Sequence, residues 1–134
     1  MNQPQNTPPA NDALNFRTIA MPADTNYNGD VFGGWLLAQM DIAGGNYAFQ
    51  HAKGRVATVG IEAMSFHLPV YVGDEVSCYC HTLRTGNTSI TVHIETWVRR
   101  LKDNQVVKVT EGNFIFVALD DKGKKRQIPS QLAE

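Results

Sequence analysis

An acidic residue in unusual surroundings is the first candidate for chemistry in this sequence. Asp41 is the only charged residue between Val31 and Gln50, and its neighbours are small or apolar. A carboxylate in such a place is costly unless it is hydrogen-bonded, paired or used in a reaction. Two explanations without function are also open: an ordinary exposed residue, or a capping residue for a helix that begins at Ile42.

Two adjacent glycines, Gly33 and Gly34, come shortly before Asp41. If a helix begins there, its first N–H groups lack intrahelical partners and carry a partial positive charge, which suits a phosphate or a developing oxyanion. Glycine also lets a substrate approach the backbone closely. A carboxylate and an oxyanion hole are sufficient for acyl-transfer hydrolysis, with Asp41 as general base or as nucleophile. Both roles need the same carboxylate, and both stay open.

The spacing of these groups favours a site shared by two copies. Gly34 and Asp41 lie seven residues apart, which is about 10 Å along one helix and too far for both to act on one carbonyl carbon. In an antiparallel pair of helices, Asp41 of one copy can lie opposite the glycine end of the other. Each dimer would then contain two sites.

The residues around Asp41 predict one long helix that ends near His51. Apolar side chains recur at spacings of three and four, which is typical of one buried stripe: Phe32, Leu36, Met40, Ala43 and Tyr47. The other side carries further small or apolar residues: Leu37, Ala38, Gly44, Gly45 and Ala48. We therefore expect the helix to be covered on two sides.

The rest of the chain is strand-like. We expect a short edge strand over 14–20, a loop over 21–30, and four long antiparallel strands over 56–66, 75–84, 89–100 and 107–119. In the last strand we expect the inner face to consist of Val107, Val109, Ile115, Val117 and Leu119. The predicted class is α+β, with the sheet wrapped around the central helix. Because this leaves the Asp41 face uncovered, we expect at least a dimer.

Composition narrows the possible partners. The net charge of −1 provides no electrostatic case for nucleic acid. We find no signal peptide and no apolar run of membrane-spanning length, so we expect a cytoplasmic protein without a membrane partner. One domain is expected over 14–129, between a loose polar tail (1–13) and a short tail (130–134). Cys78 and Cys80 are expected to be buried thiols, and no metal-ligand spacing is present.

A long motif in the N-terminal third resembles a known family. It reads Met21-Pro22-x-Asp24-Thr25-Asn26-x-Asn28-Gly29-Asp30-x-Phe32-Gly33-Gly34-Trp35, followed by Gln39-Met40-Asp41. This is similar to the bacterial YciA-type acyl-CoA thioesterases of the hot-dog superfamily. The likeness extends over about 16–129 through further short matches: Gly54-Arg55-Val56, Val72-Gly73-Asp74, Thr88-Ser89, Glu95-x-Trp97-Val98 and Gly123-x-x-Arg126-x-Ile128-Pro129.

The resemblance implies a hot-dog fold and the hydrolysis of acyl-CoA to a free acid and coenzyme A. It also implies that no metal and no cofactor is needed beyond the coenzyme A of the substrate, and that dimers often join as a trimer of dimers. By position, Asp41 is the catalytic carboxylate, and Gly33 and Gly34 form the oxyanion hole. Asn26 takes the place of an asparagine supplied by the partner subunit, although Asn28 is an alternative.

The resemblance also suggests contacts to the rest of the substrate. Thr88 and Ser89 lie where family members hold the pantetheine or the nucleotide, and Asn28 and Phe32 lie close to the catalytic positions. Arg126 is expected to contact the phosphates of coenzyme A, whereas the lysines beside it are expected to be solvated. Acyl chain length and the final oligomer stay open.

Two other functions fit the same architecture. One is a non-catalytic module that binds acyl-CoA or regulates another protein. The other is hydration or dehydration of a thioester, which usually pairs a histidine with a carboxylate. We rank the second low, because neither the expected helix before His51 nor its preceding loop contains a histidine.

Overall fold

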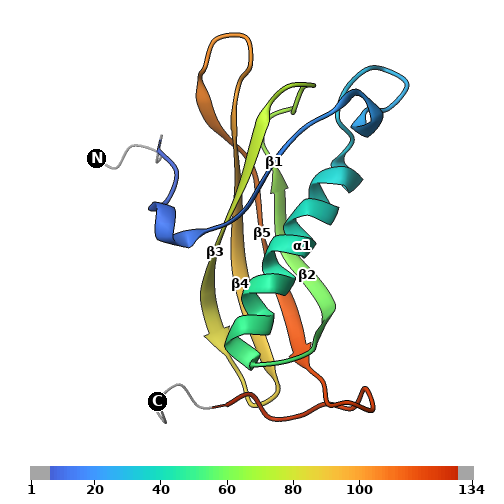
Figure 1. Ribbon diagram of the computed structural model, residues 1–134, viewed down its shortest axis with the longest axis vertical. Helices are drawn as coiled ribbons and strands as arrows, with labels where there is room; N and C mark the ends of the chain where they lie inside the picture. Colours follow the sequence, from blue (N-terminus) through green and yellow to red (C-terminus); the bar gives the residue numbers. More distant parts are fainter. Residues whose placement is uncertain (1–6, 130–134) are drawn as a thin grey trace.

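The computed structural model describes residues 7–129. One long helix, α1 (Gly33–Ala52), lies along one face of a five-stranded antiparallel sheet (Figure 1). The strands are β1 (Leu14–Ile19), β2 (Val56–Phe66), β3 (Glu75–Thr85), β4 (Ser89–Arg99) and β5 (Val106–Ala118). Two short 3₁₀ helices, η1 (Asn11–Ala13) and η2 (Pro22–Asp24), complete the elements. The expected α+β class, with a single long helix, is confirmed.

The sheet order is β1-β3-β4-β5-β2, so β1 and β2 form its two edges. Residues 1–6 of the expected N-terminal tail, and the expected C-terminal tail over 130–134, lie outside the described residues. Within 7–129, no helix is both long and apolar enough to cross a membrane.

The ends of α1 follow from local sequence. Phe32 is the N-cap and offers no side-chain hydrogen bond to the first turn. At the other end Lys53 adopts the left-handed conformation, with φ of 56°, and ends the helix. The next residue, Gly54, has no side chain, and the Arg126 Nη2 atom lies only 2.7 Å from the position that a Cβ would take there. The C-terminal segment is thereby held against the end of α1.

The buried face of α1 differs in part from the predicted stripe. Leu36, Met40 and Ala43 are buried as expected, but Phe32 is 43% exposed. Gly44, which we assigned to the opposite side, is buried against the sheet: a Cβ there would lie 2.6 Å from Ile94 Cδ1. The predicted assignment of Gly44 to the opposite side was therefore wrong. The sheet covers a wider arc of the helix surface than the predicted apolar stripe occupies.

The predicted inner face of β5 is wrong in its second half. Val109 is buried in the core, as expected, but the later core residues of this strand are Phe114, Phe116 and Ala118. Between the pairs Thr96–Thr110 and Trp97–Lys108, the register of β4 and β5 shifts by one residue. An extra residue on one strand reverses which side chains face the core from that point on.

Two neighbouring glycines of α1 provide a matched test of this packing. A Cβ at Gly44 would meet Ile94 and Phe116 at 2.6 and 2.9 Å, whereas one at Gly45 would lie 3.9 Å from Phe116. Both Gly→Ala changes gain the same helix propensity, but only Gly44→Ala overpacks the core. We expect Gly44→Ala to be less stable than Gly45→Ala by about 1–3 kcal/mol, measured by urea unfolding at one fixed protein concentration. Equal stabilities would contradict the close packing at Gly44.

Candidate active site

Asp41 lies where α1 meets β2, and it has a partner. Thr58 of β2 donates a hydrogen bond from Oγ1 to Asp41 Oδ1 at 2.5 Å. Thr58 pairs across the strands with Phe116, whose ring is in the core, so its side chain faces α1. Asp41 is in the middle of α1 and is therefore not a capping residue. In the single chain its side chain is exposed.

The start of α1 carries backbone donors without intrahelical acceptors. Trp35 N donates to Phe32 O, so the amides of Gly33 and Gly34 before it are left for other acceptors. Both glycines are exposed. A Cβ added at Gly33 would lie 3.5 Å from the Phe66 ring, and a Cβ added at Gly34 would lie 3.4 Å from the Phe32 ring. The two amides therefore open next to two aromatic rings, and the N-terminal end of the helix adds a partial positive charge.

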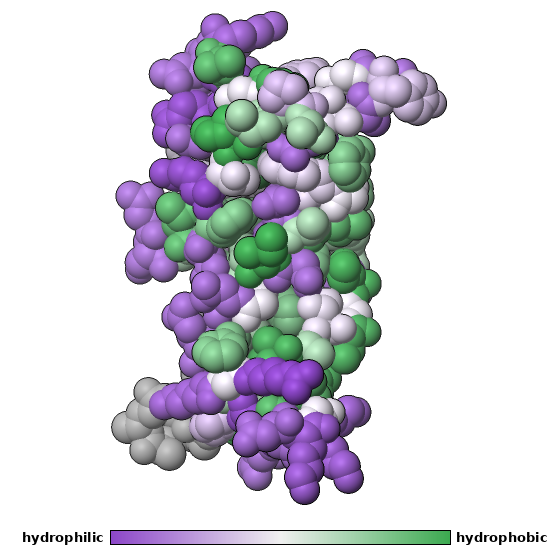
Figure 2. All heavy atoms as spheres, turned by 45° about the vertical axis from the view of Figure 1, so that its right-hand side comes forward, coloured by the Kyte–Doolittle hydropathy of each residue, from purple (hydrophilic) through white to green (hydrophobic). Residues whose placement is uncertain are grey.

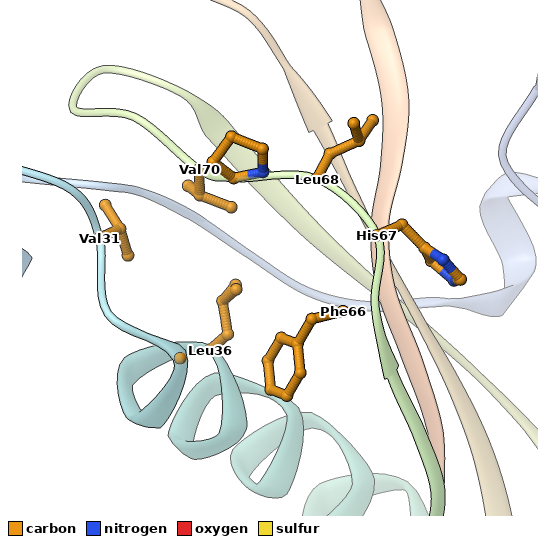
Figure 3. A pocket seen from close by; sticks show the side chains of 8 residues that line it. Val31, Leu36, Phe66, His67, Leu68 and Val70 are labelled. Carbon is orange, nitrogen blue, oxygen red and sulfur yellow. The ribbon is translucent and has the colours of Figure 1, made fainter.

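A cavity of about 410 Å³ adjoins this helix start. It lies between the first turns of α1 and residues 66–70, which are the last residue of β2 and the segment after it (Figure 3). Val31, Leu36 and Val70 are buried in its walls, whereas Phe66 and Leu68 are 53% and 44% exposed. We did not predict this cavity, because it forms between segments that are at least thirty residues apart.

The loop before α1 is shaped by Asn26. Its Oδ1 atom accepts hydrogen bonds from the backbone amides of Asn28, at 2.9 Å, and Asp30, at 3.2 Å. The loop is closed by a bridge between Thr25 and Val31, and Val31 also lines the cavity. Because the carbonyl oxygen of the Asn26 side chain serves the loop, its Nδ2 group is the part that can donate to a ligand.

Three predicted substrate contacts lie at the other end of the fold. Ala118 N donates to Thr88 O, which holds the turn containing Thr88 and Ser89 against the end of β5. Arg126 donates from Nε to Leu119 O at 2.9 Å, next to the end of α1. Within one chain the structure thus brings Asn26, Phe32, Gly33 and Gly34 together at the start of α1. It places Asp41 midway, and Thr88, Ser89 and Arg126 near the far end.

The side of the molecule that carries Asp41 is apolar and uncovered. Figure 2 shows apolar side chains gathered over this side, between hydrophilic ends. The exposed ones include Ile42 and Phe49 of α1, at 54% and 53%, and Val59 and Ile61 of β2, at 60% and 44%. Strand β2 is also an edge strand, so its outer backbone groups are open for pairing.

A polar network occupies other parts of the sheet. Glu111 accepts a hydrogen bond from His67 at 2.9 Å and also contacts His93 and Lys108. Partial burial opposes its ionisation, but hydrogen bonds from His67 and Lys108 outweigh this effect and lower the pKa of Glu111. Among residues 7–129, no three His, Cys, Asp or Glu side chains are grouped closely enough to hold a metal ion.

Comparison with known proteins places the chain in a family. A family model described as the thioesterase superfamily matches residues 28–104. The chain is also 51% identical, over 121 residues, to the acyl-CoA thioester hydrolase YciA of Salmonella typhimurium. The chain belongs to the thioesterase superfamily. The alignment with the Salmonella protein covers 88% of this chain and 91% of that protein.

Solved structures of other thioesterases share the fold. The hexameric thioesterase y2039 from Yersinia pestis has a TM-score of 0.84 and 53% identity, over 87% of this chain and 95% of that chain. An acyl-CoA hydrolase from Staphylococcus aureus, in complex with butyryl coenzyme A and coenzyme A, has a TM-score of 0.78 and 28% identity, over 86% and 70%. The expected hot-dog fold is confirmed.

The Staphylococcus hydrolase has also been solved with single alanine substitutions. In one structure the residue replaced is an asparagine, and in another it is an aspartate. These two positions are 15 residues apart in that chain.

The two cysteines of this thioesterase-superfamily chain are buried free thiols, as expected. Burial raises the pKa of Cys78 to about 11, against a hydrogen bond with Thr96 that lowers it. Burial, and then the neighbouring Cys78, raise the pKa of Cys80 to about 12. Because the thiolate is the reactive form, neither cysteine is a candidate nucleophile at neutral pH.

This burial predicts how the native protein reacts with a thiol reagent. At pH 8 the native chain should bind almost no Ellman's reagent, because both thiols are protonated and enclosed. The same protein in urea should release the colour of two thiols per chain, matching Cys78 and Cys80. A Gln105→Cys variant, at an exposed turn position, should react in the native state and serves as the control. Full labelling of the native wild-type chain would contradict the burial.

Proposed function

We propose that this protein hydrolyses acyl-CoA to a free carboxylic acid and coenzyme A, in the cytoplasm, at a site that two copies share. The relative from Salmonella typhimurium is named an acyl-CoA thioester hydrolase, and the Staphylococcus aureus neighbour was solved with butyryl coenzyme A. The observation that carries the proposal is the position of Asp41. It is held by Thr58 on an open, apolar face, on the same helix as an uncapped pair of glycine amides.

The apolar face made by α1 and β2 is the proposed dimer interface. Exposed side chains such as Ile42 and Val59, together with the open edge of β2, are suited to a second copy across a two-fold axis. Gly34 and Asp41 of one chain are about 10 Å apart along the helix axis. Antiparallel helices would bring Asp41 close to Gly33 and Gly34 of the partner subunit. Because the Yersinia pestis relative is hexameric, we further propose that three such dimers associate.

The chemistry follows from these positions. The thioester carbonyl oxygen accepts hydrogen bonds from the amides of Gly33 and Gly34, which stabilise the negative charge that develops on it. Asp41 either takes a proton from the water that attacks the carbonyl carbon or attacks that carbon itself, and water then releases the acid. The carbon–sulfur bond breaks, and the coenzyme A sulfur leaves and takes up a proton. No metal or additional cofactor is required in either route.

Asn26, rather than Asn28, is the proposed catalytic asparagine. Asn26 and Asp41 are 15 residues apart, the same separation as the asparagine and aspartate replaced in the Staphylococcus aureus hydrolase. The Oδ1 atom of Asn26 is held by the loop, so its Nδ2 group donates to the thioester or to the attacking water.

The remaining predicted residues bind the substrate outside the reacting bond. Asn28 lies in the loop and Phe32 lies at the helix start, and both are beside the thioester. Thr88, Ser89 and Arg126 bind the pantetheine and the phosphates. Arg126 already donates to Leu119 O and Gln127 O, so the backbone fixes the direction of its guanidinium group.

Replacement of Asp41 tests the central assignment. Asp41→Ala removes the group that activates water or attacks the thioester, so the rate of free-thiol release from butyryl-CoA should fall by about 100- to 10,000-fold. The elution volume of the oligomer should not change, because the substitution leaves the apolar side chains of the proposed interface, such as Ile42 and Val59, in place. The matched control is Asp121→Ala, in the exposed turn after β5, which should retain full activity.

Two results would overturn the assignment. Turnover by Asp41→Ala at the wild-type rate would remove Asp41 from the chemistry. Calorimetric binding of butyryl-CoA by the wild-type protein, without thiol release at high protein concentration, would instead favour the non-catalytic binding module.

Thr58 is proposed as a positioning residue, because it contacts Asp41 and not the reacting atoms. Hydrogen bonds to charged groups contribute about 1.5–3 kcal/mol, so Thr58→Val should lower kcat by about 10- to 100-fold with little change in KM. Thr58→Ser keeps the hydroxyl and should restore most of kcat. Thr18→Val, on the distant edge strand β1, is the control. Equal kcat values for Thr58→Val and wild type would contradict this role.

A further inference from the structure

Tyr27 has the most exposed large apolar side chain among the described residues, and it follows the proposed catalytic asparagine directly. Its side chain is 99% exposed, although hydrogen bonds hold the loop that carries it. Asn26 N donates to Asp30 O at 2.8 Å, and Gly29 N donates to Asn26 O at 2.9 Å. Within residues 7–129, the Tyr27 side chain has no hydrogen bond and no ring contact. An aromatic ring presented in this way on a fixed loop is typical of a contact between proteins.

A second exposed aromatic side chain, Phe49, lies on the side of α1 assigned to the dimer interface. Phe49 is 53% exposed. Ile42, Asn46 and Phe49 are all exposed, and their spacings of four and three place them on one side of the helix. Ile42 belongs to the proposed interface. Phe49 therefore continues that interface toward the end of α1.

The loop of one chain extends beyond the start of its helix (Figure 1). A bridge between Thr25 and Val31 closes the loop, and the loop tip is three residues from either side of the bridge, a reach of about 10 Å. In the proposed antiparallel pair, the helix start lies opposite the partner's Asp41. Phe49 follows Asp41 by eight residues, which is about 12 Å along the helix. The loop tip and the partner's Phe49 therefore lie at about the same height along the paired helices.

We propose that Tyr27 packs against the partner's Phe49 and thereby holds the loop in the shared site. Because Asn26 precedes Tyr27 in the sequence, this contact fixes the asparagine relative to the partner's Asp41. Aromatic pairs are stabilised by buried area and by offset or edge-to-face ring contacts. Each dimer would form two such contacts, one at each end of the paired helices. This inference rests on the proposed function, and it adds Tyr27 and Phe49 as positioning residues that do not touch the reacting atoms.

Cross-linking tests the contact directly. In a Tyr27→Cys/Phe49→Cys variant, a short bismaleimide should join the two chains of a dimer, which then run at twice the chain mass on a denaturing gel. The native thiols, Cys78 and Cys80, are buried and do not compete. Tyr27→Cys/Leu83→Cys is the control, because Leu83 is also exposed but lies on β3, which β4 and β5 separate from β2. This control and each single cysteine variant should run as single chains.

Steady-state kinetics with butyryl-CoA tests the positioning role. Tyr27→Ala and Phe49→Ala should each lower kcat by about two- to tenfold with little change in KM. Because both remove the same contact, the double variant should lose no more than the larger single loss. Tyr27→Phe keeps the ring and should retain most of kcat, and Leu83→Ala should be fully active. Gel filtration and circular dichroism verify that each variant is folded and assembled as wild type under the assay conditions.

The outcomes separate this inference from the proposed function. If Tyr27→Cys/Phe49→Cys is not cross-linked although wild type hydrolyses acyl-CoA as a dimer or hexamer, the contact is overturned and the function stands. Cross-linking of Tyr27→Cys alone would show a different neighbour and would also overturn the contact. Additive losses of kcat in the double alanine variant would overturn the positioning role. If the two cysteines are joined but wild type releases no thiol from acyl-CoA, the contact stands and the catalytic proposal fails.

Discussion

The packing of a single helix against the sheet is the constraint on which the rest of this structure depends. Only α1 covers the sheet among the described residues, so its buried side must be flat enough to lie close to β4 and β5. Gly44 makes this possible, because a side chain there would collide with Ile94 and Phe116. Leu36 and Met40, about one turn apart on the same side of the helix, are buried against the rest of the core. Once this side is buried, the opposite side of α1 and the edge strand β2 are necessarily left open.

The open side combines groups that would conflict in an ordinary core. Asp41 is a charge among exposed apolar residues, and its hydrogen bond to Thr58 links the helix to the edge strand. The helix begins at Phe32 and Gly33 without a side-chain cap, although capping usually stabilises a helix by about 1 kcal/mol. A carboxylate on an open apolar face, and amide donors without intrahelical acceptors on the same helix, are what the proposed hydrolytic site requires.

Irregular strands position the remaining parts of the site. The register of β2 against β5 shifts twice, between Thr58 and Gly60 and between Glu62 and Ser65. The first shift reverses which side chains of β2 face α1, and the second reverses this again. Thr58 and Phe66 therefore both lie on the helix side. Thr58 meets Asp41, and Phe66 meets Gly33. Between the two shifts, Ile61 pairs with Phe114 and therefore lies on that face as well. Bulges of this kind are local, and they adjust single side chains without altering the order of the sheet.

Local patterns were sufficient to predict much of this protein from its sequence. The helix from the first glycines to about His51, the long strands and the buried Cys78 and Cys80 all follow from periodicity and turn residues. The unusual position of Asp41 among small residues was also visible. Each of these signals lies within about twenty consecutive residues, and hydrophobic spacing and backbone preferences act over that range.

Tertiary structure alone decided the features that depend on register and on contacts between distant segments. The core residues Phe114 and Phe116 were misassigned because one extra residue in β5 reverses the alternation, and no local propensity marks that point. Thr58 was missed because its role depends on which face of β2 it occupies, although a polar residue in an apolar strand was a signal. The cavity between Val31 and Val70 exists only because two loops meet beside the helix start. The sequence thus determined the elements and the lone acid, whereas close packing of distant segments determined what that acid and the helix start lie against.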